Sequence, residues 1–341
     1  MKILMIYTGG TIGMIEDPVS HTLKPFDFDH LIENVPKIAQ LGYDIDHVQF
    51  DPPIDSSNMN PECWKEIAKY IADGYDKYDG FVVLHGTDTM AYTASALSFM
   101  LQGLAKPVVI TGSQLPIGEV REDGTENLIT ALQIAAAKDT VTGAPMVQEV
   151  VISFENYLIR GNRSTKVSAT NFRAFVSFNY PDLAKMDLHI DFVKDYLWRP
   201  VSQGPLDVKY NMDPNVGVVF LFPGITEQNL KNQLNDASLK GIVLRTFGAG
   251  NAPTESWFTD ALAEATARGL VIVNITQCPN GGVEEKRYYT GDMLAKAGVI
   301  SGGDMTCEAA ITKMMYLFGL GLDSQQVANY MQSNLNGELT A

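Results

Sequence analysis

Two threonines follow two apolar runs of the chain, where their hydroxyls could act on a bound molecule. Thr11 lies in the stretch Thr-Gly-Gly-Thr-Ile-Gly, directly after the apolar start of the chain. Thr87 follows a second apolar run and stands beside the carboxylate of Asp88. Glycine permits tight turns, and backbone N–H groups beside a hydroxyl can stabilise a developing negative charge. This pattern favours acyl transfer by a hydroxyl nucleophile.

The glycine-rich stretch alone leaves two functions open. A free threonine hydroxyl is a poor nucleophile and needs a base, whereas a glycine turn before a helix can instead bind an anion. The stretch lacks the lysine and spacing of a P-loop and is not a dinucleotide fingerprint. The five histidines include no pair at metal spacing, and the three cysteines form no metal or redox motif, so no metal site is predicted.

The ordered set of motifs resembles the bacterial-type L-asparaginases, and the cytoplasmic type I members match it best. The set is Thr-Gly-Gly-Thr-Ile-Gly, then His-Gly-Thr-Asp-Thr-Met from residue 85, then Arg-Gly-Asn-Arg-Ser-Thr-Lys from residue 160. Three further segments extend the resemblance over nearly the whole chain: 55–64, 110–116 and 244–253. One such motif is weak evidence, but the ordered set is specific.

The resemblance implies a relay of hydroxyl, amine and carboxylate formed by Thr87, Lys166 and Asp88, comparable to a Ser–Lys pair. It also makes Thr11 the favoured nucleophile. From the residues alone, Asp88 is also suited to cap a helix that starts near Thr89. Lys166, in a polar loop, would by itself be interpreted as a surface lysine.

Ser56 and Ser57 follow Asp55 in a loop before an expected helix, and by themselves they indicate a cap or turn. In the resembled family this position supplies hydroxyl and backbone donors to the α-carboxylate of the substrate. The position of Asp88 holds the α-ammonium. Such a clamp would place the side-chain amide of L-asparagine near Thr11.

Residues 14–25 are expected to form a lid beside the nucleophile. Many family members carry a lid tyrosine that orients the nucleophilic threonine. This chain has no tyrosine between Tyr7 and Tyr43, and Thr22 or Leu23 stands about where it would fall. The supporting role of that tyrosine is therefore left unassigned.

Some cytoplasmic members bind asparagine at a second site and respond to it sigmoidally. The positions that match this effector site here are Thr165, Arg245 and Cys278. From the residues alone, Arg245 ends a strand and Cys278 packs in a core, which is an equally good interpretation. The resemblance also implies a homodimer or homotetramer.

Short runs rich in valine and isoleucine alternate with helical patterns, which is typical of the α/β class. We expect a larger, doubly wound N-terminal domain with a mainly parallel sheet over 1–190, a linker over 191–213 and a smaller C-terminal α/β domain over 214–341. The expected strands are 2–8, 81–86, 107–112, 149–154, 216–222, 241–247 and 270–276. The expected helices are 61–78, 89–103, 124–138, 225–235, 255–268 and 306–318.

Length and charge exclude several classes of function. At 341 residues the chain exceeds the usual size of a single core. Its net charge of −15 argues against general binding to nucleic acid. No stretch approaches the roughly 20 apolar residues that span a membrane, and the apolar start is too short for a signal peptide. We therefore expect a cytoplasmic protein with neither nucleic-acid nor membrane partners, and no cofactor.

The function predicted is hydrolysis of L-asparagine to L-aspartate and ammonia through an acyl-enzyme on a threonine. A glutaminase-asparaginase of mixed specificity and a non-catalytic amino-acid sensor are the alternatives. The related subunit of the tRNA-linked amidotransferase carries a further N-terminal domain, for which a motif starting at Thr8 is expected to leave no room. A nucleotide-binding protein is disfavoured because the phosphate fingerprints are missing.

Overall fold

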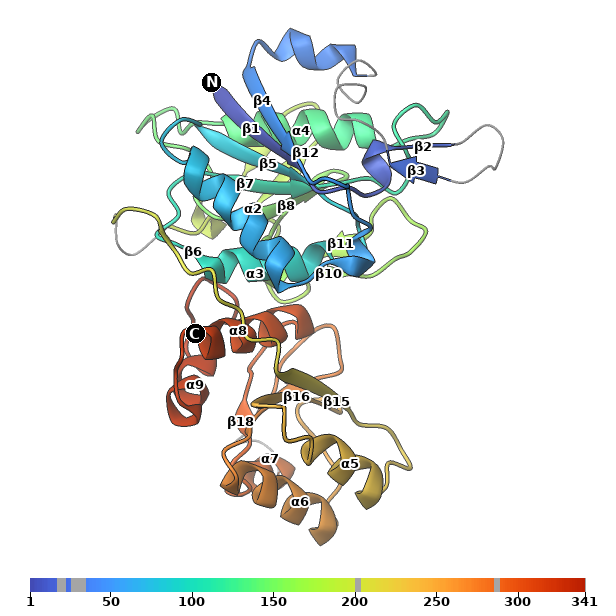
Figure 1. Cartoon of the computed structure of the whole chain (residues 1–341), viewed down its shortest axis with the longest axis vertical. Helices are drawn as coiled ribbons and strands as arrows, with labels where there is room; N and C mark the ends of the chain where they lie inside the picture. The colour runs from blue at the N-terminus through green and yellow to red at the C-terminus, as the bar shows by residue number, and fades with distance from the viewer. Residues whose placement is uncertain (17–22, 26–34, 200–203, 285–288, 341) are drawn as a thin grey trace. The chain divides into compact units, whose positions relative to one another are not determined.

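The computed structural model describes residues 1–16, 23–25, 35–199, 204–284 and 289–340 (Figure 1). They divide into two compact units, Met1–Tyr210 and Asn211–Ala341, and each is described by itself. The domain boundaries and the linker expected over 191–213 stay a prediction. The short elements η5 (Lys194–Tyr196) and β14 (Asp207–Val208) fall within that range.

The main sheet of the first unit has, within the described residues, eight strands in the order β13-β12-β9-β8-β7-β5-β1-β4. Neighbours from β4 to β8 pair in parallel, whereas β9, β12 and β13 pair antiparallel. The prediction of a mainly parallel sheet is therefore confirmed. The strands are β1 Lys2–Tyr7, β4 Asp44–Gln49, β5 Gly80–Leu84, β7 Val108–Thr111, β8 Val150–Phe154, β9 Tyr157–Arg160, β12 Ala184–Met186 and β13 Ile190–Phe192.

Three helices cover this sheet, with α2 and α3 on one face and α4 on the other (Figure 1). They are α2 Pro61–Gly74, α3 Met90–Met100 and α4 Gly124–Ala136. Asn60 starts α2, because its side-chain oxygen accepts the N–H groups of Glu62 and Cys63. The apolar and small residues of α3 are nearly all buried.

Short elements connect the strands of the first unit. They are the 3-10 turns η1 Thr11–Gly13, η2 Pro36–Leu41, η3 Ser56–Asn58 and η4 Gly161–Arg163, and the strand pairs β2 Met14–Glu16 with β3 Leu23–Pro25, β6 Leu101–Gln102 with β14, and β10 Thr165–Lys166 with β11 Phe175–Val176. Such short segments carry too few residues for a period to show in the sequence.

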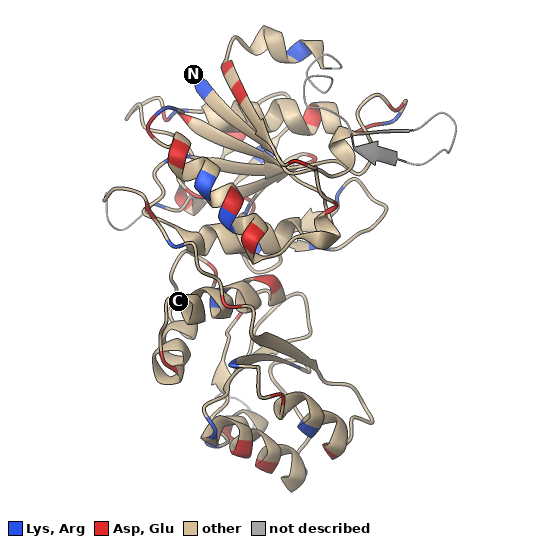
Figure 2. Ribbon diagram, viewed as in Figure 1, with Lys and Arg blue, Asp and Glu red and all other residues tan. Residues whose placement is uncertain are grey.

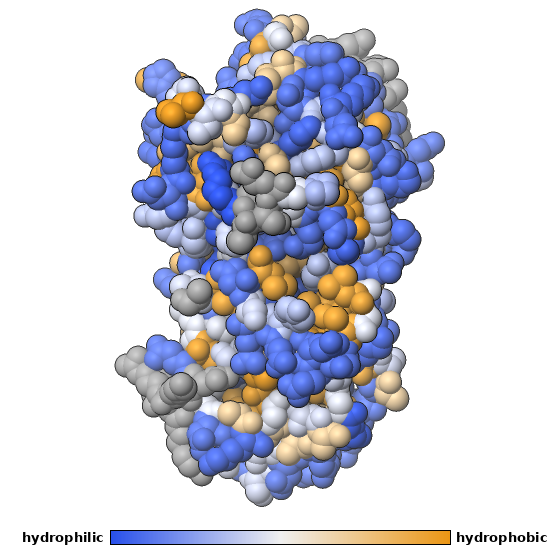
Figure 3. All heavy atoms as spheres, turned by 90° about the vertical axis from the view of Figure 1, so that its left-hand side faces the viewer, coloured by the Kyte–Doolittle hydropathy of each residue, from blue (hydrophilic) through white to orange (hydrophobic). Residues whose placement is uncertain are grey.

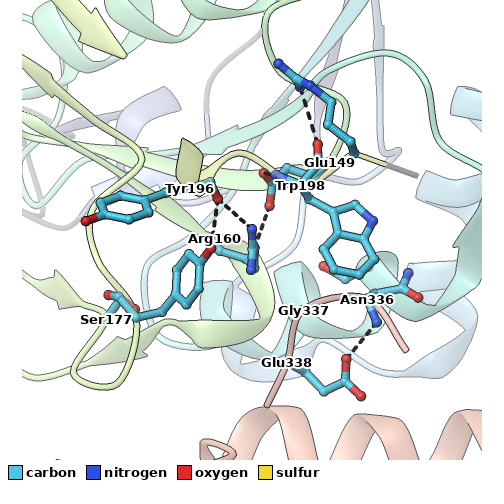
Figure 4. Close-up of polar contacts among 12 residues, drawn as sticks. Glu149, Arg160, Ser177, Tyr196, Trp198, Asn336, Gly337 and Glu338 are labelled. Atoms are coloured by element: carbon cyan, nitrogen blue, oxygen red, sulfur yellow. Dashed lines mark hydrogen bonds and ion pairs between the residues drawn. The ribbon is translucent and has the colours of Figure 1, made fainter. Parts of the chain in front are cut away.

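A buried ion pair fixes β9 in the first unit (Figure 4). Arg160 Nε lies 2.8 Å from a carboxylate oxygen of Glu149, and the two side chains are only 4% and 6% exposed. The same guanidinium donates to the backbone oxygen of Tyr196, while Glu149 accepts the backbone N–H of Trp198. Each buried charge is thus paired and hydrogen-bonded, which anchors the strand that leads to β10.

The second unit has a parallel sheet in the order β15-β16-β17-β18, which confirms the smaller α/β layer. Its strands are β15 Val216–Phe220, β16 Gly241–Thr246, β17 Val271–Thr276 and β18 Ile300–Ser301, and its helices are α5 Glu227–Leu234, α6 Ser256–Ala267, α7 Tyr289–Lys296, α8 Cys307–Gly319 and α9 Ser324–Met331. Among the described elements of this unit, β18, α7 and α9 were not predicted from the sequence, and in the main sheet of the first unit β4, β9, β12 and β13 were not predicted either. A core of aliphatic side chains around Phe258 lies between the sheet and helices α5 and α6.

One buried lysine fastens the end of the second unit to α8. Lys313 and Glu338 are fully buried, with Nζ and Oε1 2.6 Å apart. Lys313 also donates to the backbone oxygens of Met331 and Ser333, and Glu338 accepts the backbone N–H of Asn336 (Figure 4). Burial lowers the pKa of the Lys313 ammonium, while Glu338 opposes that shift.

The surface is mixed in charge and polarity. Acidic and basic residues alternate along α2 (Figure 2). The face drawn in Figure 3 is largely hydrophilic, with hydrophobic residues in separate patches. Among the described helices, none has the length and apolar character needed to cross a membrane.

Candidate active site

The predicted site residues follow the carboxyl ends of adjacent parallel strands. Ser56 comes after β4, Thr11 after β1 and Thr87 after β5. The strands end together, because Tyr7 pairs with both Gln49 and Leu84. Ligands of open α/β sheets bind beyond this edge, so the fold itself brings these side chains to one place.

The turn that carries Thr11 packs directly against the turn that carries Thr87. Gly10 has φ of 92°, a conformation that L side chains rarely adopt. A Cβ at Gly10 would lie 2.5 Å from the Cα of Gly86. The two backbones can therefore approach only because Gly10 lacks a side chain, and this contact brings the two threonine turns together.

Lys166 lies against Thr87 and Asp88, as the resemblance implied. Its Nζ donates to Thr87 Oγ1 at 2.8 Å and lies 2.7 Å from Asp88 Oδ1. The Lys166 side chain is 18% exposed, so it is not a surface lysine, whereas that of Asp88 is 66% exposed. The N-cap of α3 is Thr89, and the carboxylate of Asp88 contacts Lys166.

Lys166 reaches this position from a hairpin that is remote in the sequence. It lies on β10, which pairs antiparallel with β11 through Lys166 and Phe175. Val167 N–H donates to the oxygen of Ala174, which closes the loop between the two strands. The hairpin thus brings the Lys166 amine into contact with a threonine that lies 79 residues earlier in the chain.

The two serines have different environments. Ser56 is buried, and its backbone oxygen accepts the hydroxyl of Thr89 at 2.7 Å. Ser57 is exposed, and its backbone N–H donates to Asp55 Oδ1 at 2.8 Å. Hydrogen bonds from the backbone and side chain of Ser57 lower the pKa of the Asp55 carboxyl. Asp55 therefore caps the η3 turn and keeps Ser56 at the strand end.

A cavity of about 230 Å³ lies over these strand ends. The predicted residues that line it are Thr11, Ser56, Thr87, Asp88 and Lys166, and the other lining residues are Gly10, Met14, Asp55, Gly86, Gln114 and Ala169. Ser57 is not part of this lining. Sequence reasoning assigned no role to Gln114, although it lies in the quoted segment 110–116. Its position as a polar residue after strand β7 was the available signal.

His85 is hydrogen-bonded through both ring nitrogens. Trp64 Nε1 donates to Thr93 Oγ1 at 3.0 Å, and that oxygen lies 2.8 Å from His85 Nε2. Because the carbonyl oxygen of Gly86 can only accept, His85 Nδ1 donates to it, and Nε2 of the neutral ring then accepts from the Thr93 hydroxyl. Burial lowers the pKa of His85 to about 4. The imidazole is therefore a neutral support for the Thr87 turn.

The residues expected to form an effector site lie in both units. Thr165 precedes Lys166 in the first unit, while Arg245 and Cys278 lie near the carboxyl ends of β16 and β17 in the second. Cys278 is exposed, so the interpretation that it packs in a core is wrong. Arg245 Nε is buried and has no hydrogen-bond partner among the described residues. The effector site stays a prediction.

Half of the expected lid, residues 17–22, falls outside the described residues. Residues 17–22, which include Thr22, are not described, while the backbones of β2 and β3 pair through Glu16 and Leu23. On the other side of the nucleophile turn, Tyr7 donates its hydroxyl to the oxygen of Gly13 at 3.0 Å. Burial raises the pKa of this phenol, which remains a neutral donor.

Within the described part of the chain, no three His, Cys, Asp or Glu side chains converge where they could hold a metal ion. The cavity instead is lined by three residues with hydroxyls, Thr11, Ser56 and Thr87, by two carboxylate residues, by the amine of Lys166 and by the glycines of both threonine turns. This set is suited to hydroxyl-based acyl transfer.

Comparison with known proteins decides the family. The model "Asparaginase, N-terminal" matches residues 2–197, and the model "Glutaminase/Asparaginase C-terminal domain" matches residues 215–331. The chain belongs to the asparaginase family. L-asparaginase 1 of Escherichia coli is 44% identical to it over 340 residues, 99% of this chain and 98% of that protein. The resemblance drawn from the motifs is therefore confirmed.

Solved structures of asparaginases have the same fold as this asparaginase-family chain. L-asparaginase I from Vibrio cholerae aligns with a TM-score of 0.89 at 41% identity, covering 100% of this chain and 99% of that one. The probable cytoplasmic L-asparaginase from Campylobacter jejuni aligns with a TM-score of 0.79 at 27% identity, covering 98% and 99%. The likeness extends over both units.

Proposed function

We propose that this chain is an L-asparaginase, which hydrolyses L-asparagine to L-aspartate and ammonia. The observation that carries the proposal is the hydrogen-bonded set of Lys166, Thr87 and Asp88 in one cavity with Thr11. A hydroxyl that contacts an amine in a small cavity is the arrangement that nucleophilic acyl transfer needs. The relative from Escherichia coli, which aligns with nearly the whole chain, is named for this activity.

The reaction takes two steps in this proposal. The oxygen of Thr11 bonds to the amide carbon of asparagine, the C–N bond breaks, and the amide nitrogen leaves as ammonia with the threonine proton. Water then cleaves the ester to release aspartate and restore the hydroxyl. The pair of Lys166 and Thr87 moves protons beside the reacting carbon, and backbone N–H groups of the glycine turns stabilise the oxyanion.

We assign the acylated residue to Thr11 because it sits in the glycine turn, whereas the hydroxyl of Thr87 is engaged by Lys166. A hydroxyl that accepts from an ammonium is a proton carrier more than a free nucleophile. The variant Thr11→Val keeps the shape and removes the hydroxyl, so turnover should fall by more than about tenfold, a barrier change of roughly 1.4 kcal/mol. Thr142→Val, in an exposed turn, is the matched control.

The substrate is held at both ends of its α-carbon in this proposal. Ser56 and Ser57 lie at the α-carboxylate, and Asp88 accepts the α-ammonium. A longer glutamine side chain then overshoots Thr11. Because a methylene is worth about 1–3 kcal/mol in discrimination, asparagine should exceed glutamine by at least about tenfold in kcat/KM.

The proposed activity is tested by measuring ammonia release from asparagine and from glutamine with the same purified protein. Ammonia release from asparagine alone, or at least about tenfold higher kcat/KM for asparagine than for glutamine, supports an asparaginase. Equal rates on both substrates would indicate the glutaminase-asparaginase of mixed specificity. Binding of asparagine without ammonia release would indicate the amino-acid sensor and overturn the proposal.

We further propose a cytoplasmic homodimer or homotetramer that binds asparagine at a second site through Thr165, Arg245 and Cys278. Support for the effector comes from Arg245, whose buried Nε has no acceptor among the described residues and would suit a carboxylate. The location follows the Campylobacter jejuni relative, which is titled a probable cytoplasmic enzyme.

A further inference from the structure

Gln114 lines the cavity together with Thr87 and Lys166. It follows β7, on the far side of β5 from the Thr11 turn. Its Oε1 lies 3.4 Å from Thr87 Oγ1, and its Nε2 donates to the backbone oxygen of Asn171 at 2.9 Å. One amide therefore touches both the relay and the loop between β10 and β11.

The orientation of this amide follows from its partners. The backbone oxygen of Asn171 can only accept, so the NH₂ of Gln114 must face it. The amide oxygen then faces Thr87. Lys166 donates to the same threonine oxygen at 2.8 Å, so the hydroxyl hydrogen of Thr87 is directed at Gln114 Oε1.

The backbone of Gln114 is held rigidly where the side chain needs it. Its N–H donates to both carboxylate oxygens of Asp123 at 3.0 Å, and Leu115 N–H donates to the first of them at 3.1 Å. Asp123 stands at the N-cap of α4, yet its side chain makes no capping hydrogen bond there. The side-chain NH₂ of Asn127 donates both to Asp123 Oδ2 and to the backbone oxygen of Gly112. The helix terminus thus holds the loop that carries Gln114.

The loop on the other side of Gln114 carries part of the cavity. Ser168 Oγ accepts the N–H groups of Thr170 and Asn171, which shapes the loop after Lys166. Ala169, between them in the chain, lines the cavity. The bond from Gln114 to the Asn171 oxygen therefore ties this loop to the segment after β7.

We propose that Gln114 is a positioning residue for the proposed asparaginase reaction: it accepts the Thr87 hydrogen, so that a lone pair of Thr87 Oγ1 faces Lys166, and it holds the loop that follows Lys166. The amide accepts the Thr87 hydrogen while Lys166 is an ammonium. When Lys166 is a neutral amine, that hydrogen turns to Nζ, the O–H bond breaks, the N–H bond forms, and Oγ1 keeps the electron pair. The long 3.4 Å contact lets the hydrogen leave easily.

The test replaces the amide by an apolar side chain of similar length, Gln114→Met. Loss of a hydrogen bond that acts on the proton-carrying hydroxyl of Thr87 should lower kcat by about 5- to 30-fold while KM stays within about twofold. A residue that only fills space would leave kcat unchanged. Gln102→Met is the matched control, because Gln102 is also half-buried and donates to one backbone oxygen.

Asn171→Ala is a second control, since it keeps the backbone oxygen that Gln114 contacts and removes only an exposed side chain. Both controls should keep kcat within about twofold of the wild type. If Gln114→Met does not fold, Gln114→Glu decides, because a carboxylate keeps the size and polarity but has no N–H for the Asn171 oxygen. The same loss of kcat at constant KM is expected.

Three results would overturn the role of Gln114 in an active wild-type enzyme. The first is an unchanged kcat in Gln114→Met. The second is a rise in KM alone in that variant, which would make Gln114 a substrate-binding group. The third is a loss of kcat in Asn171→Ala equal to the loss in Gln114→Met. A wild-type protein that releases no ammonia from asparagine would instead overturn the proposed function. The two failures are therefore distinguishable.

Discussion

The relay of Lys166 and Thr87 leads to a prediction about how their losses combine. Lys166→Met keeps a similar length and apolar bulk but removes the amine that lies 2.8 Å from Thr87 Oγ1. A positioned general base contributes about 10²- to 10⁴-fold to the rate. The variant should therefore lose that factor in kcat, which is about 2.7–5.4 kcal/mol of barrier.

The double variant Lys166→Met/Thr87→Val is the decisive measurement. If the amine acts only through the threonine hydroxyl, removing both costs about as much as removing either one. If they act independently, the losses multiply to about 10⁴- to 10⁸-fold. The predicted coupling is therefore at least about 2.7 kcal/mol, far above the few tenths found between independent sites.

The assay is ammonia release at saturating asparagine, with enough enzyme to follow the slow variants. Lys185→Met is the control, because Lys185 is an exposed lysine of the same unit that pairs with Asp187 and does not line the cavity. It should leave kcat unchanged. Additive losses in log kcat for Lys166→Met and Thr87→Val, with both proteins folded, would refute the relay.

Three further predictions concern stability and regulation. Burial holds the pKa of His85 at about 4, below its usual 6.5, so the unfolded chain binds the proton first. The free energy of unfolding should therefore fall as the pH drops from about 6.5 toward 4, by about 3 kcal/mol in full. Urea unfolding at several pH values should show a weaker acid dependence in His85→Asn, and an identical dependence would contradict this. Lys313→Met leaves the carboxylate of Glu338 buried without its cation and should lower the free energy of unfolding by about 3–5 kcal/mol. The double variant Lys313→Met/Glu338→Gln should lower it less. A double variant as unstable as the single one would show that a buried unpaired charge is not the cause. Asparagine should give a sigmoidal rate curve that becomes hyperbolic in Arg245→Ala, and a hyperbolic wild-type curve that this change leaves unaltered would rule out the effector site.

The larger elements were predictable because their periodicity is local. The buried strands β1, β5 and β16 are continuous apolar runs, and α2 starts at an Asn-Pro pair that caps it. The elements of the two main sheets and their helices that the sequence did not predict are two to eight residues long, namely β4, β9, β12, β13, β18, α7 and α9. In such short segments, packing against the rest of the unit decides the conformation.

The sequence by itself determined which groups could do the chemistry, because hydroxyls, a carboxylate and an amine are properties of residue type. It also placed Thr11 and Thr87 at strand ends, since parallel strands present their carboxyl ends at one edge. The 2.8 Å contact between Lys166 and Thr87 joins residues 79 apart in the chain, so the sequence alone reached it only through family resemblance.

Tertiary structure alone decided the role of Gln114 and the environment of His85. A glutamine after a strand has no period or cap signal, and its meaning arises only when Asp123, Thr87 and the Asn171 oxygen converge on it. The histidine is neutral because the fold buries it completely, which no local pattern records. Sequence determines the chemistry available, whereas the close approach of distant backbones determines which groups touch and what their protonation must be.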